Sequence, residues 1–66
     1  MTIQVNGEPM ELSDGSTLLQ LLEQLQLNPD GVAVALNLEV VPRTQHAEVT
    51  LRHGDRIELV RAVGGG

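Results

Sequence analysis

Turn-forming residues divide this chain into short segments, and a single segment has the spacing of an amphipathic helix. Its apolar face repeats at i, i+3, i+4 and i+7, the period of one helical stripe, and consists of Leu18, Leu21, Leu22 and Leu25. The pattern predicts a helix from Thr17 to about Leu27, with Ser16 as its N-cap. Because a proline pushes the preceding residue out of the helical region, Pro29 should end the helix before Asn28. One amphipathic helix has to bury its stripe against strands.

Strand patterns lie on both sides of this helix. Asn6-Gly7 stands between two alternating runs, and this dipeptide favours the two-residue turn of a hairpin, which predicts a hairpin over residues 2–12. Pro9 has no N–H for a ladder, so its strand should lie at a sheet edge. The run Val32–Leu36 is apolar without alternation and predicts a strand covered on both faces, or nearly so.

The remaining segments complete the element order. A compact turn is predicted at 28–31, a short strand at 40–41, and a polar loop or single helical turn at 43–48. Residues 48–52 are a further strand candidate, and the last strand is predicted at 56–63. This order predicts the α+β class, with a mixed sheet of about five strands and one main helix packed on one face. The predicted core consists of Ile3, Val5, Leu12, Leu18, Leu22, Leu25, Val34, Leu36, Ile57 and Leu59.

Size and composition exclude several kinds of protein. A 66-residue chain forms one domain with a small core, which disfavours a self-sufficient enzyme with a deep pocket. The chain has no cysteine, so it has no disulfide and no thiolate ligand or nucleophile, and a small domain of this kind fits a reducing cytoplasm. Its net charge of −5 and its lack of aromatic residues argue against nucleic acid. It contains no apolar run long enough for a membrane span.

Conventional catalytic or metal-binding groups are few. Glu8, Glu11 and Asp14 are close in sequence, but exposed loop and edge-strand carboxylates need no functional explanation. His46 and His53 are seven positions apart on predicted loops and lack metal-ligand spacing, so both are predicted to be surface histidines. No metal site and no bound cofactor are expected.

The C-terminal glycines offer a different chemistry. Gly64, Gly65 and Gly66 follow the last predicted strand directly, so we expect a domain over residues 1–63 and a flexible tail over 64–66. Glycine has no Cβ, so such a tail can pass through a narrow channel and present the terminal carboxylate to an enzyme. ATP can activate that carboxylate as an acyl-adenylate.

Five stretches of the sequence, together with this tail, resemble the ubiquitin-like β-grasp superfamily and, within it, the ThiS family of sulfur carriers of thiamine (thiazole) biosynthesis. The stretches are Ile3–Gly7, Leu18–Leu25, Val32–Asn37, Val40–Arg43 and Gly54–Val60. The family tends to have an aromatic residue near position 46, where this chain has His46, and most often has a varied residue where this chain has Gly64.

The resemblance implies that the chain is a carrier and not an enzyme. An E1-like adenylyltransferase would use ATP to adenylate Gly66, and a persulfide donor such as a cysteine desulfurase would supply sulfur for a thiocarboxylate there. Gly64 and Gly65 would thread the tail into partners, and thiazole synthase would take the sulfur. Alternatives are the small subunit of molybdopterin synthase, a ubiquitin-like protein modifier, or a plain interaction module.

A partner that accepts the tail has to meet the strand that leads to it. The predicted partner surface is therefore the exposed side of the last strand and the residues beside it, and consists of Arg56, Glu58, Val60, Arg61 and Ala62. Val60 and Ala62 lie opposite the core face by alternation and are apolar without a burial reason. Pairing of an extended partner segment with a free sheet edge is a second way to bind this strand.

Overall fold

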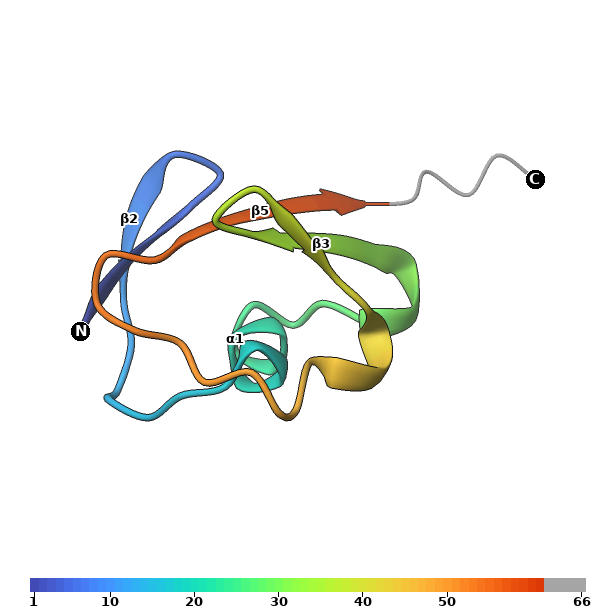
Figure 1. Cartoon of the computed structure of the whole chain (residues 1–66), viewed down its shortest axis with the longest axis horizontal. Helices are drawn as coiled ribbons and strands as arrows, with labels where there is room; N and C mark the ends of the chain where they lie inside the picture. The colour runs from blue at the N-terminus through green and yellow to red at the C-terminus, as the bar shows by residue number, and fades with distance from the viewer. Residues whose placement is uncertain (62–66) are drawn as a thin grey trace.

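A computed structural model describes residues 1–61 of the chain (Figure 1). The bounds of the strands and the main helix are β1 Thr2–Val5, β2 Glu8–Glu11, α1 Leu18–Gln24, β3 Val32–Leu36, β4 Glu39–Val41 and β5 Arg56–Arg61. Two short 3₁₀ turns, η1 at Pro29–Gly31 and η2 at Arg43–Gln45, join the longer elements. Over the described residues the strands form one five-stranded sheet in the order β2-β1-β5-β3-β4.

The sheet is mixed, because β1 and β5 run parallel while the other neighbouring strands are antiparallel. α1 lies across one face, and within residues 1–61 no helix covers the opposite face (Figure 1). The predicted α+β architecture is confirmed, and β2, which carries Pro9, is an edge strand as predicted. β5 lies between β1 and β3, but its pairing with β1 ends at Ile57, so pairing of a partner with this side of the strand near Arg61 stays a prediction.

The core is the layer between the sheet and α1. The fully buried apolar side chains are Ile3, Leu12, Leu18, Leu21, Leu22, Val34, Leu51 and Ile57. Four residues of the predicted core are only partly buried and pack against this cluster, namely Val5, Leu25, Leu36 and Leu59. The predicted core omitted Leu21, which lies on the leucine stripe of α1, and Leu51, which lies in the segment before β5.

The ends of α1 differ from the prediction. Thr17 is the N-cap, and its hydroxyl accepts a bond from the N–H of Gln20 while the Gln20 side chain accepts from the N–H of Thr17. This reciprocal capping box satisfies two helix-end donors, whereas the Ser16 hydroxyl donates to the carbonyl of Ser13. At the other end, Gln26 has a positive φ of 60°, and Leu27 donates to the carbonyl of Leu22. The helix therefore ends in a Schellman-type turn, well before Pro29.

Two strand predictions are wrong in part. Only one face of β3 is covered, because Val34 is buried while Ala33 is exposed. Its alternation is hidden in the sequence because the outward positions hold alanine, which counts as apolar. Residues 48–52 form no strand in the described chain, and their pairing is a single bridge between Thr17 and Thr50.

His46 is a buried residue, contrary to the predicted surface position. Its side chain is 2% exposed, and its Nε2 lies 3.1 Å from the carbonyl oxygen of Val41. Its Nδ1 has no hydrogen-bond partner among the described residues. The position thus packs a ring beneath η2, which fits the aromatic residue that the resemblance leads one to expect there.

Candidate functional site

The predicted partner surface is divided between the two faces of the sheet. Along β5, Ile57 and Leu59 face the core, so Arg56, Glu58 and Val60 face away from α1. These three residues are exposed as predicted. Arg61 lies on the same side as Leu59, on the helix side of the sheet. Ala62, Gly64, Gly65 and Gly66 lie outside the described residues.

The uncovered face of the sheet presents an apolar patch that sequence reasoning found only in part. The register places Ala33 opposite Val60 on neighbouring strands, and Ala35 opposite Val40. Val40 is 79% exposed and Val60 is 64% exposed. We call these four residues the open-face patch. Only Val60 was identified from the sequence, because the alanines of β3 were assigned to a doubly covered strand.

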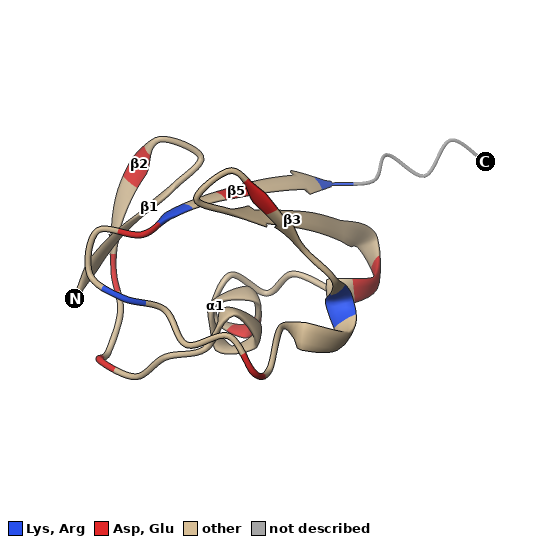
Figure 2. Cartoon of the chain, viewed as in Figure 1, with Lys and Arg blue, Asp and Glu red and all other residues tan. Residues whose placement is uncertain are grey.

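Charged residues border the open-face patch. Glu58 lies opposite Ala35 in the register, and Arg56 precedes it on the same face of β5, whereas Glu39 lies opposite Leu36 on the helix side of the sheet. The four arginines of the chain lie apart from one another and form no cluster (Figure 2). The charges on this face, Glu58 and Arg56, have opposite signs, but the chain as a whole has a net charge of −5, which favours a partner with an apolar surface and basic groups around it.

A surface hollow of about 560 Å³ lies on the other side of the sheet, where the sequence led us to expect no pocket. It is lined mainly by apolar side chains, and its lining is Val5, Asn6, Glu8, Pro9, Met10, Leu25, Leu27, Leu59 and Arg61. Its two charged residues, Glu8 and Arg61, are both exposed. Its lining has one carboxylate, that of Glu8, and no histidine or hydroxyl group, so it lacks a pair of acid–base groups.

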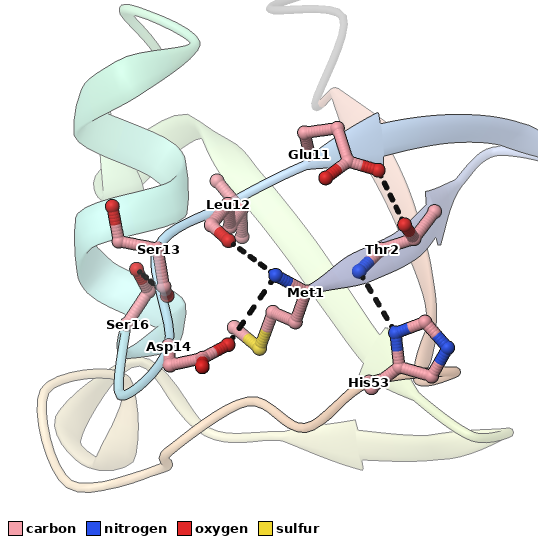
Figure 3. A network of polar contacts seen from close by, with 8 residues as sticks. All are labelled: Met1, Thr2, Glu11, Leu12, Ser13, Asp14, Ser16 and His53. Carbon is pink, nitrogen blue, oxygen red and sulfur yellow. Dashed lines mark hydrogen bonds and ion pairs between the residues drawn. The ribbon is translucent and has the colours of Figure 1, made fainter.

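The acidic residues and His53 near β1 make structural contacts (Figure 3). The N–H of Thr2 donates to Nδ1 of His53 at 3.0 Å, and the Thr2 hydroxyl donates to the carboxylate of Glu11. The ammonium group of Met1 donates to the carbonyl of Leu12 and lies 3.3 Å from the carboxylate of Asp14. Residues 1–61 contain no cluster of three metal-ligating side chains. These polar groups hold β1 in place, and none of them is arranged for catalysis.

Among residues 1–61, no helix has both the length and the apolar character required to cross a membrane.

Comparison with known proteins gives one consistent result. Residues 3–66 match the model of the ThiS family. The chain is 39% identical over 66 residues to the sulfur carrier protein ThiS of Escherichia coli, and the alignment covers the whole of both proteins. It also resembles the crystal structure of a thiamine biosynthesis protein (ThiS) from Geobacter metallireducens, with a TM-score of 0.86, 32% identity and full coverage of both chains.

A second kind of relative is much longer. A thiazole synthase of Paramagnetospirillum magneticum is 39% identical to the chain over 66 residues. The alignment covers the whole chain but only 20% of that enzyme. A ThiS-like segment and a thiazole synthase can therefore belong to one polypeptide.

Proposed function

This chain belongs to the ThiS family, as a sulfur carrier protein of thiamine biosynthesis with the β-grasp fold, and on that premise we propose that Gly66 carries the sulfur as a thiocarboxylate. The chain is not itself the catalyst in this proposal. An E1-like adenylyltransferase activates Gly66, a persulfide donor supplies the sulfur, and thiazole synthase receives it. We place these steps in the cytoplasm.

The chemistry follows from the weak reactivity of a carboxylate. The Gly66 carboxylate attacks the α-phosphate of ATP, which releases pyrophosphate and leaves an acyl-adenylate. A persulfide from a donor such as a cysteine desulfurase then displaces AMP, and reduction of the resulting S–S bond by a thiol leaves the thiocarboxylate. ATP is consumed by the activating partner, and the proposal requires no cofactor bound to this chain.

The composition of the chain supports this use of its terminus. The chain contains neither cysteine nor lysine. No side-chain thiol or primary amine of the chain can therefore attack its own activated acyl group. A carrier with a reactive end benefits from this lack of side-chain thiols and primary amines.

The architecture supports the proposed route to the partners. β5 is held between β1 and β3 and ends at Arg61, immediately before residues 62–66. We propose that residues 1–63 act as the recognised domain and that Gly64 and Gly65 form the segment that enters the partner. The partner surface in this proposal consists of Arg56, Glu58, Val60, Arg61 and Ala62, extended by the open-face patch. The thiazole synthase relatives, which contain a ThiS-like segment, support that enzyme as one partner.

Substitution of the terminal glycine tests the proposal. Gly66→Ala places a methyl group beside the reacting carboxylate, and a displacement of about 1 Å can reduce a rate by roughly 10²-fold. Intact mass spectrometry after incubation with the adenylyltransferase, ATP and a sulfur donor should show replacement of one oxygen by sulfur in the parent chain and a strongly reduced rate in the variant. Gly64→Ala is the comparison variant and should have a milder effect, because the family most often has a varied residue at that position. A normal rate for Gly66→Ala would contradict the proposed passage of the tail through a narrow channel.

A further inference from the structure

Leu38 combines two unfavourable features. It is the second central residue of the two-residue turn between β3 and β4, where its φ is 73°. L-residues with a Cβ are strained in this left-handed region, which glycine occupies freely. The Leu38 side chain is also 85% exposed, more than the other large exposed hydrophobic residues of the described chain.

Neither feature benefits the fold. An 85% exposed leucine gains little from removal of apolar surface from water, and glycine at the same position would be free of the strain. The two-residue turn requires this backbone conformation but does not require leucine, so the presence of a strained leucine is a reason to look for a function.

The position of Leu38 connects it to the proposed partner surface. It lies two residues before Val40 of the open-face patch, at the tip of the same hairpin. The adjoining Asn37 donates its N–H to the carbonyl of Arg56, at the start of β5. Arg56 and Arg61 are five residues apart on this strand, or about 17 Å at the usual strand rise. Leu38 and the end of β5 therefore mark opposite ends of one continuous surface.

We propose that Leu38 is an anchor that inserts into an apolar pocket of thiazole synthase while the C-terminal residues enter the active site of that enzyme. The inference rests on the proposed function, in which the synthase receives the sulfur. Glu39 adjoins Leu38, and Asp55 accepts a hydrogen bond from the side chain of Asn37, so acidic groups border the anchor. The complementary pocket is apolar with basic residues at its rim. The two-residue turn already fixes the backbone at Leu38, so binding costs little backbone freedom, which suits an anchor.

The test compares Leu38→Gly with a matched control, Gln26→Gly. Gln26 is also exposed and has a positive φ of 60°, but it lies at the end of α1, on the covered side of the sheet. Both substitutions place glycine at a left-handed position and so remove backbone strain. Both variants should therefore melt at or above the melting temperature of the parent chain. Binding to purified thiazole synthase, measured by calorimetry with the full chain, should be at least about tenfold weaker for Leu38→Gly and unchanged for Gln26→Gly.

Other outcomes have defined meanings. Parent-like binding of Leu38→Gly to the synthase overturns the anchor, and normal thiocarboxylate formation on Gly66 in the same preparation shows that the proposed function survives. Weakened binding to the adenylyltransferase alone overturns the choice of synthase as the occupant. If Val60→Glu weakens synthase binding while Leu38→Gly does not, the interface is confined to the β5 side and the anchor is again wrong. A parent chain that neither binds the synthase nor forms a thiocarboxylate overturns both proposals.

Discussion

The two hairpin turns of this fold have the same backbone form but different sequences. Asn6-Gly7 joins β1 to β2 with φ values of 51° and 83°, and Asn37-Leu38 joins β3 to β4 with φ values of 50° and 73°. Both pairs have the positive φ values of a type I′ turn, which matches the twist of the flanking strands. The first turn has the residues that this geometry prefers. The second turn has asparagine followed by a leucine that is strained and exposed.

The asparagines show that the two turns have the same structural task. The Asn6 side chain accepts from the N–H of Leu59 at 2.8 Å and donates to the carbonyl of the same residue at 3.3 Å. The Asn37 side chain accepts from the N–H of Arg56 at 3.0 Å. Each turn is thus fastened to β5 by its first residue. The two turns differ in sequence only at the second residue, so that position is where requirements other than folding can act.

Removal of the fastening asparagines should have the largest effect on stability. Asn6→Ala loses two hydrogen bonds to β5 and a residue that tolerates the left-handed region, so the free energy of unfolding should fall by roughly 2 kcal/mol. Asn37→Ala should cost a similar amount, and urea denaturation of both variants measures this. A large effect at one asparagine and none at the other would show that the turns are not equivalent.

A leucine in the first turn should have a smaller effect. In Gly7→Leu the new side chain would meet open space, since no atom lies within 4 Å of a Cβ built at this glycine. The cost is therefore the left-handed backbone alone, about 1–2 kcal/mol, and a thermal or urea melt measures it. Unchanged stability in Gly7→Leu would mean that Leu38 is not strained either, and the case for its function would weaken.

The two turns also show how far the sequence predicts this fold. Asn6-Gly7 predicted its hairpin because the residues agree with the backbone they adopt. Asn37-Leu38 gave no such signal, because leucine at a left-handed position contradicts local preference. Gln26 hid the end of α1 in the same way, since the Schellman-type turn usually has glycine at that position. In each case packing and hydrogen bonding determine a conformation that the residue type opposes.

The burial of side chains was predictable where the hydrophobic periodicity of the sequence was strong. The prediction failed for single residues outside such a pattern. The leucine stripe of α1 predicted its buried face, whereas His46 lies in a short polar segment without any period and is nevertheless buried. For the candidate site, Val60 followed from alternation along β5. Val40 and Ala33 depend on the strand register, which brings together residues far apart in sequence and cannot be read from either segment alone.

Exchange of the leucine between the two turns should have the smallest effect on stability and separates folding from function. The double variant Gly7→Leu, Leu38→Gly introduces strain at one turn and relieves it at the other. The turns are fastened to β5 at Leu59 and Arg56, about 10 Å apart along the strand, and substitutions at that separation usually add within about 0.5 kcal/mol. The free energy of unfolding should therefore match the parent within about 1 kcal/mol. If Leu38 acts only through stability, the double variant should also bind thiazole synthase like the parent, whereas an anchor at the β3–β4 turn requires binding to remain as weak as in Leu38→Gly alone.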